Sequence, residues 1–249
     1  MIRAFAVVVP ARNEHALIGR CLDALLAARE RARTSAPAVS MRLIVVADAC
    51  TDETAALARS VDGVEVIEIA AGAVGSARAA GALRAIEEFC GVSQGFTSDE
   101  VWVANTDADS VVPDNWIVEQ LALAESGVDA MLGTVRPDPA DLSSENLRLW
   151  QEHHASPEPR GRIYGANLGI RADHYLRAGG FAPLAEHEDV DLIARARLAG
   201  TETFATGSCE VITSGRRHGR TPGGFARYLR VDLHARAAGS SPAPDSIPI

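Results

Sequence analysis

VWVANTDAD, at residues 101–109, is an apolar run typical of a buried strand that ends in two aspartates one residue apart. A parallel strand delivers its last residues to the edge of the sheet where ligands bind, so Asp107 and Asp109 could meet a divalent cation that holds a diphosphate. An Asp-rich turn is the simpler interpretation, because Asp supports tight turns and Pro113 marks a helix start. On this stretch alone the turn is the better explanation.

The composition is typical of one globular α/β unit. With 249 residues, of which 47% are hydrophobic, the chain can bury a large core as one domain or as two lobes that share a sheet. The net charge of -9 and the scattered arginines argue against a nucleic-acid-binding surface. All 24 basic residues are arginine, and the absence of lysine excludes, within this chain, covalently bound pyridoxal phosphate and a Walker-type phosphate loop.

Nothing in the sequence predicts export or membrane insertion. The first residues lead directly into an apolar strand without a charged leader, and no apolar run reaches the length of a membrane span. The four cysteines are far apart, as expected of free thiols in a reducing compartment. We therefore expect a cytoplasmic protein with no integral membrane segment. Weak peripheral membrane association and a homodimer are both compatible with the sequence.

Apolar runs alternate with helical spacing through the first half of the chain. Residues 4–9, closed by a proline, and residues 43–47 predict strands buried on both faces, and the alternating residues 64–69 predict a third strand nearer the sheet edge. Helices are predicted at about 16–33, from Thr51 to about Arg59, and at about 76–89. This alternation predicts an α/β fold, with a doubly wound, mainly parallel sheet and helices on both faces.

The second half of the chain has a less regular pattern. We predict helices at about 114–125, 144–154, 173–178, 189–199 and 224–238, and strands at 129–135, 163–170, 203–204 and 211–213. Residues 239–249, rich in serine and proline, are expected to form a disordered tail.

Four polar segments each follow the carboxyl end of a predicted strand or the loop after it. They are PARNE at 10–14, DACTD at 48–52, GAVG at 72–75 and DAD at 107–109. Because the carboxyl ends of strands in an open α/β sheet line one crevice, we expect these segments to converge there. Asp48 could accept hydrogen bonds from a base or ribose, and Arg12 or Arg78 could reach phosphate. Any one of these residues is better explained as a cap or turn, but together they favour a nucleotide site.

On these motifs the chain resembles the family 2 glycosyltransferases of GT-A fold, from about Ala4 to Ser214. The matching segments are VPARNE at 9–14, VVADACTD at 45–52, ARAAG at 77–81, DAD at 107–109, GAN at 165–167 with GGF at 179–181, and EDVDL at 188–192. The resemblance implies a single domain over residues 1–238, with a nucleotide-sugar-binding half at about 1–110 and an acceptor-binding half at about 111–222. Ala47, Ala49, Cys50 and Ala79 depart from the family's usual residues, so the donor's base and sugar stay open.

The resemblance implies a metal-dependent glycosyltransferase of hexosyltransferase type, which moves a sugar from a nucleoside-diphosphate sugar to an acceptor hydroxyl with inversion. It implies that Mg²⁺ or Mn²⁺ is bound by Asp109 and Asp107, and that Asp189 is the catalytic base beside Glu188. Acids at a helix N-terminus that complement its dipole are the competing interpretation of Glu188 and Asp189. The candidate residues for donor binding are Pro10, Arg12, Asn13, Glu14, Asp48, Arg78, Asp107, Asn167 and Arg217.

The basic segment SGRRHGR at 214–220 has two interpretations. His218 could complete the cation's ligand shell while Arg216 and Arg217 hold a diphosphate, or the segment could be an exposed basic loop. Two other functions also stay open: a retaining glycosyltransferase of the same fold, and a non-catalytic nucleotide-sugar-binding subunit. A sugar nucleotidyltransferase is disfavoured by the missing lysine, and a dehydrogenase by the missing Gly-x-Gly-x-x-Gly motif.

Overall fold

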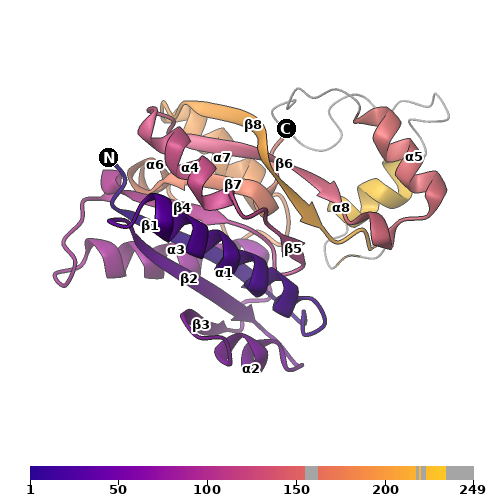
Figure 1. Cartoon of the computed structure of the whole chain (residues 1–249), viewed down its shortest axis with the longest axis horizontal. Helices are drawn as coiled ribbons and strands as arrows, with labels where there is room; N and C mark the ends of the chain where they lie inside the picture. Colours follow the sequence, from indigo (N-terminus) through magenta and orange to yellow (C-terminus); the bar gives the residue numbers. More distant parts are fainter. Residues whose placement is uncertain (155–161, 217–218, 220–222, 234–249) are drawn as a thin grey trace.

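The computed structural model describes residues 1–154, 162–216, 219 and 223–233 (Figure 1). The predicted tail at 239–249 and the candidate residues Arg217 and His218 lie outside the described residues.

The first half of the chain forms four parallel strands in the order β3-β2-β1-β4. They are β1 (Ala4–Ala11), β2 (Ser40–Asp48), β3 (Val64–Ile69) and β4 (Val101–Asn105). Side chains alternate between two cores: Phe5 and Val7 pack on one face of the sheet, and Ala6 and Val8 on the other. Both faces are buried because helices cover both, which explains why β1 and β4 are continuous apolar runs.

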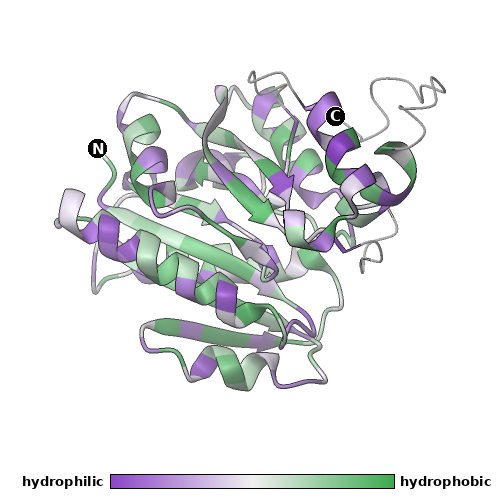
Figure 2. Ribbon diagram, turned by 45° about the vertical axis from the view of Figure 1, so that its right-hand side comes forward, coloured by the Kyte–Doolittle hydropathy of each residue, from purple (hydrophilic) through white to green (hydrophobic). Residues whose placement is uncertain are grey.

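Helices cover the two faces in separate layers (Figure 1). The face that includes Phe5 is covered by α1 (Ile18–Ser35), α2 (Thr54–Arg59) and α4 (Trp116–Glu125), and the opposite face by α3 (Val74–Cys90), α6 (Ala172–Arg177) and α7 (Glu188–Leu198). Figure 2 shows the resulting pattern, with largely hydrophobic strands between helices of mixed hydropathy. Gly81 lets α3 lie close on the sheet, since a Cβ there would come 2.5 Å from a Val8 methyl carbon.

The second half extends the same sheet in mixed directions. The full order is β3-β2-β1-β4-β7-β6-β8-β5, with β7 antiparallel to β4 and β6, β8 parallel to β6, and β5 antiparallel to β8. These strands are β5 (Ser110–Val111), β6 (Ala130–Pro137), β7 (Leu168–Arg171) and β8 (Thr203–Thr213). The mainly parallel α/β fold is thus confirmed, and each antiparallel pair includes a strand of the second half.

Several predicted elements differ from the observed ones. The two short strands predicted at 203–204 and 211–213 are one strand, β8, whose register with β6 shifts between Gly133 and Val135. The strand predicted at 163–170 begins as a 3₁₀ turn, Gly165–Asn167. Thr51 does not cap α2; instead Asp52 accepts the Thr54 N–H at 3.0 Å.

The remaining helices are short. They are α5 (Ser144–His153), α8 (Phe225–Arg227), a π-helical turn (Tyr228–Asp232), and 3₁₀ turns at Ser98–Glu100 and Pro139–Asp141. The helix predicted at 224–238 is therefore described only in part. A satellite core of Leu149, Trp150, Tyr228, Leu229 and Leu233 joins α5 to the last turns, beside the main sheet (Figure 1). Among the described helices, none combines the length and hydropathy of a membrane span.

Candidate active site

Two adjoining cavities open at the carboxyl ends of β1, β2 and β4. The first cavity, of about 220 Å³, is lined by Pro10, Arg12, Glu14, Asp48, Asp109 and Arg216 among others. The second, of about 190 Å³, is lined by Arg78, Tyr164, Glu188, Asp189, Phe225 and Tyr228 among others. Asp107, Val74, Thr213 and Phe225 line both. The topology therefore brings the two predicted acid pairs, Asp107/Asp109 and Glu188/Asp189, to neighbouring parts of one cleft.

Asp48, at the end of β2, lines the first cavity and is hydrogen-bonded to a neighbouring loop. It is 3% exposed, and its carboxylate accepts three backbone N–H bonds, from Ala71 and Gly72 at 2.8 Å and from Ala73 at 2.9 Å. Arg12 donates from Nη1 to the Gly72 carbonyl at 3.3 Å. Asp48 therefore shapes the loop at 71–73, and only part of its hydrogen-bonding capacity remains for the base or ribose that the sequence suggested.

The loop after β1 is tied to the loop after β2. Asn13 adopts a left-handed backbone conformation with φ of 52°, and its Oδ1 accepts the Thr51 N–H at 2.7 Å. The Glu14 N–H donates to Thr54 Oγ1 at 2.7 Å. Asn13 lines neither cavity, whereas Pro10 and Glu14 line the first. Asn13 thus acts in the structure as a brace between two loops.

Two nearly buried carboxylates in the first cavity share one arginine. Arg216 Nη2 lies 2.8 Å from Asp109 Oδ2 and 2.9 Å from Glu14 Oε1, and its Nη1 donates to Glu14 Oε2 at 3.2 Å. Burial and, second to it, the charge of Asp107 raise the pKa of Asp109 to about 6, against the opposing effect of Arg216. Asp109 is therefore a carboxylate whose charged form requires a positive partner.

Arg78, from the first turns of α3, lies between the two acid pairs. It donates from Nε to Glu188 Oε1 at 2.8 Å and from Nη2 to Asp107 Oδ1 at 2.6 Å, and its side chain is 3% exposed. Gly165 leaves the space it occupies, since a Cβ there would come 2.5 Å from Nη2. Among the described residues, the buried Nη1 group has no partner. Most of the guanidinium is therefore bound to acids of the protein, whereas the sequence suggested that it could bind phosphate.

Asp189 lies in the first turn of α7 and faces the second cavity. Its carboxylate accepts the Gly165 N–H at 2.6 Å and the Val190 N–H at 2.8 Å. Burial raises the pKa of Asp189, and the charge of Asp107 adds to this while Arg78 opposes it. Burial also raises the pKa of Glu188 against the effect of Arg78. A raised pKa suits a group that must take up a proton near neutral pH.

Asn167, a donor-binding candidate from the sequence, is not among the residues that line either cavity. It is fully buried, accepts the Trp116 Nε1–H at 2.8 Å, and donates from Nδ2 to the carbonyls of Thr134 and Cys209, both at 2.9 Å. These bonds fix the turn before β7 against the core. Its amide is satisfied by the protein, so its place in the family-like motif serves folding.

The second cavity has an aromatic lining that no sequence motif indicated. Tyr164, Phe225 and Tyr228 line it, with the Phe225 and Tyr228 ring centroids 6.3 Å apart in a stacked arrangement and Tyr164 edge-on to Phe225 at 6.5 Å. No spacing rule links residue 164 to residue 225, so the sequence carried no signal that these rings would meet.

The carboxylates fit a small divalent cation. Asp107 and Asp109 supply hard oxygen ligands, and Mg²⁺ is typically held by one or two carboxylates together with substrate phosphates. Their mutual repulsion, which adds to burial in raising the pKa of Asp109, would be relieved by a cation between them. Within the described residues, no cluster of three or more His, Cys, Asp or Glu side chains forms a ready metal site. Any further ligands would have to come from water, from the substrate or from residues outside the described ranges.

Comparison with known proteins now adds to this geometry. The sequence model of the family described as Glycosyl transferase family 2 matches residues 6–175, more than half of the chain. The chain belongs to this family. The family assignment and the GT-A fold predicted from the motifs are thereby confirmed. No curated protein sequence matches the chain significantly.

Solved structures agree with this chain in fold. TarS 1-349 from S. aureus, in complex with UDP-GlcNAc, superposes with a TM-score of 0.65 at 14% identity, covering 89% of this chain and 61% of that one. The chain thus spans about three fifths of that TarS fragment. The mannosyltransferase PcManGT from Pyrobaculum calidifontis, in complex with GDP-Man and Mn²⁺, gives 0.60 at 20% identity, covering 98% and 66%. Glucosyl-3-phosphoglycerate synthase from Mycobacterium tuberculosis, in complex with Mn²⁺, UDP and phosphoglyceric acid, gives 0.51 at 18%, covering 97% and 80%.

Proposed function

We propose that this protein is a glycosyltransferase that moves a hexosyl group from a nucleoside-diphosphate sugar to an acceptor hydroxyl. The donor's diphosphate would occupy the first cavity, and the acceptor the second. The observation that carries the proposal is that Asp107 lines both cavities, between Asp109 on one side and Asp189 on the other. Family membership and the sugar nucleotides bound by TarS and PcManGT support it.

Asp189 is the proposed general base. The acceptor oxygen attacks the anomeric carbon, the bond from that carbon to the diphosphate oxygen breaks, and the hydroxyl proton passes to the Asp189 carboxylate. Direct displacement of this kind inverts the anomeric configuration. The two backbone N–H bonds to Asp189 hold its carboxylate toward the second cavity. Glu188, tied to Arg78, fixes the start of α7 and so orients its neighbour.

Asp109 and Asp107 would hold Mg²⁺ or Mn²⁺. Such an ion, when bound, neutralises charge on the diphosphate leaving group. The Mn²⁺ bound by PcManGT and by the M. tuberculosis synthase supports this choice of cofactor. Arg12 and Arg216, which line the same cavity, are the protein's own cations beside the proposed diphosphate site.

The second cavity suits an acceptor that presents an apolar or ring face. Tyr164, Phe225 and Tyr228 offer aromatic surface close to Asp189, and aromatic rings pack well against the faces of sugars and other rings. The acceptor hydroxyl would be placed at the acidic end of the cavity, and its body along this aromatic lining.

A binding screen tests the proposal. Full-length protein is titrated by calorimetry with UDP, GDP and ADP, each with and without Mn²⁺, and the matching sugar nucleotides are then tested for transfer to added acceptors. We expect one nucleotide to bind in a Mn²⁺-dependent way that Asp109→Asn abolishes. Absence of binding by all three, or equal binding by the variant, would refute the proposed donor site.

Proton NMR of the first product formed separates the enzymatic alternatives. An inverted anomeric configuration is expected for direct displacement assisted by Asp189, whereas retention would favour the alternative of a retaining transferase. Binding without donor turnover in the presence of a range of acceptors would favour the non-catalytic alternative.

A further inference from the structure

The proposed chemistry does not explain why Arg216 contacts two acids of the first cavity. Its guanidinium lies against both Asp109 Oδ2, at 2.8 Å, and Glu14 Oε1, at 2.9 Å. The two acid side chains are only 11% and 7% exposed, while the arginine is 33% exposed. A cation already stands at the carboxylate that the proposed function assigns to a divalent ion.

We propose that Arg216 is a built-in counter-cation, which competes with the divalent ion for Asp109 and moves to the donor's diphosphate when the donor binds. The inference rests on the proposed function, because it takes Asp109 as a metal ligand. Two positive charges a few ångströms apart repel strongly in a partly buried site, so Asp109 Oδ2 cannot keep Arg216 at 2.8 Å and also ligate an ion without cost.

The surroundings of Asp109 allow such an exchange. The Thr213 and Ser110 hydroxyl groups lie 3.4 and 3.5 Å from Oδ1, on the oxygen that Arg216 does not contact. The carboxylate therefore keeps contacts when Arg216 leaves Oδ2. Arg216 lines the first cavity, so a diphosphate there lies within its reach, and guanidinium groups bind phosphate oxygens through paired hydrogen bonds.

Competition of Arg216 for Asp109 and its move to the diphosphate predict opposite changes in ligand affinity when Arg216 is removed. Loss of Arg216 should strengthen binding of the cation alone, because the competitor is gone. The same loss should weaken binding of a nucleoside diphosphate at saturating cation, because one phosphate contact is gone. A purely structural arginine would weaken both, since its removal would disturb the cavity.

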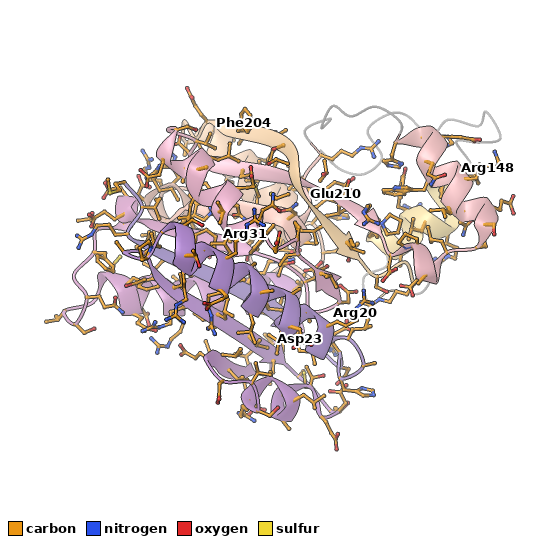
Figure 3. All side chains as sticks on the ribbon, in the orientation of Figure 1. Arg20, Asp23, Arg31, Arg148, Phe204 and Glu210 are labelled. Atoms are coloured by element: carbon orange, nitrogen blue, oxygen red, sulfur yellow. The ribbon has the colours of Figure 1, made fainter. Side chains whose placement is uncertain are left out.

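The experiment measures Mn²⁺ binding by the electron paramagnetic resonance signal of free Mn²⁺. It compares the full-length protein with Arg216→Gln, Arg216→Lys and the control Arg148→Gln. Arg148 forms an exposed i,i+4 pair with Glu152, with both side chains more than half exposed, and Figure 3 labels it on α5. The control removes the same charge at a surface position that lines neither cavity.

We expect Arg216→Gln to bind Mn²⁺ about tenfold more tightly without nucleotide, and UDP or GDP about tenfold more weakly with saturating Mn²⁺. Arg216→Lys should also bind Mn²⁺ more tightly than the parent protein, because an ammonium group cannot reproduce the two-sided contact to Glu14 and Asp109. Arg148→Gln should match the parent protein in both measurements. Circular dichroism checks that each variant is folded.

Three results would overturn the inference. Unchanged or weaker Mn²⁺ binding by Arg216→Gln shows that Arg216 does not compete. A Lys variant equal to the parent protein shows that net charge, and not contact with Asp109, sets the affinity. Failure of every variant to bind Mn²⁺, even with UDP or GDP, removes the proposed metal site together with this inference. If the parent protein binds Mn²⁺ and nucleotide together and Arg216→Gln binds both with the same affinities, this inference fails while the proposed metal site stands.

Discussion

The two cavities of the cleft are each organised by one arginine that pairs with two acids. Arg78 joins Asp107 to Glu188, and Arg216 joins Asp109 to Glu14. The Arg78 side chain is 3% exposed, whereas that of Arg216 is 33% exposed. The same residue type therefore serves two purposes, as a fixed part of the protein in the second cavity and as an exchangeable cation in the first.

Replacement of Arg78 is expected to have the largest effect on stability, because a buried acid would lose its partner. Arg78→Met should lower the free energy of unfolding by about 3–5 kcal/mol, because Glu188 would keep its burial without its partner. Urea denaturation measures this change, and Arg148→Met on the outer face of α5 is the matched control (Figure 3). A loss below about 1 kcal/mol would show that Arg78 is not a fixed part of the fold.

The next effect separates the two acids at the start of α7. Glu188 is bound to Arg78, whereas within the described part of the chain Asp189 accepts hydrogen bonds from the backbone N–H groups of Gly165 and Val190. The Asp189 carboxylate is therefore the one available for proton transfer. Asp189→Asn should lower kcat by about 10²–10⁴-fold with unchanged nucleotide affinity. Asp191→Asn, in the same helix turn, is the control. A loss confined to KM would remove Asp189 from the chemical step.

Much of the fold could be predicted from the first half of the sequence. β3 has the predicted bounds, Val64–Ile69, because an alternating run between turn residues has few other solutions. The second half was harder. β8 was predicted as two short strands because its middle, Thr206 to Ser208, is polar and contains glycine, and β5 has only two residues. Pairing with distant strands stabilises both, and local periodicity does not record it.

The site could be predicted only in its parts. Strand ends and the family-like motifs brought Asp48, Asp107, Asp109 and Asp189 to one cleft. Their partners could not be predicted, because Arg78 and Glu188 are 110 residues apart and Glu14 and Arg216 are 202 apart. Whether Asn167 faced the cleft or the core depended on a single 3₁₀ turn. Short motifs thus locate the site, while tertiary pairing decides what each side chain does.

The pH dependence of stability tests whether burial controls the Asp189 carboxylate in the second cavity. Burial raises its pKa in the folded protein above the value in the unfolded chain, so folding favours the protonated form. This contribution is fully present below the unfolded pKa and is lost as pH rises through the folded-state pKa. Asp189→Asn has no such proton to lose. The thermal midpoint of the variant, relative to the parent protein, should therefore rise as the pH increases above about 4, the ordinary pKa of an Asp carboxyl.

A control limits that measurement to the buried acid. Asp191→Asn, in the same helix turn and paired with Arg195, is the matched control for the loss of one carboxylate. A constant difference between Asp189→Asn and the parent protein across the series would mean that burial does not control this carboxylate.

The smallest effect concerns the stability of Arg216 variants, and it decides whether the two arginines really differ. Arg216→Gln leaves Asp109 and Glu14 without their shared partner, but solvent reaches the site, so we expect a loss of only about 1–2 kcal/mol. Saturating Mn²⁺ should restore that loss, because an ion bound at Asp109 replaces the missing charge and stabilises the folded state. The same ion should not restore Arg78→Met, whose unpaired Glu188 lies in the other cavity. Thermal unfolding of both variants with and without Mn²⁺ measures this, and equal recovery of the two would mean that a single electrostatic site, rather than a fixed and an exchangeable arginine, organises the cleft.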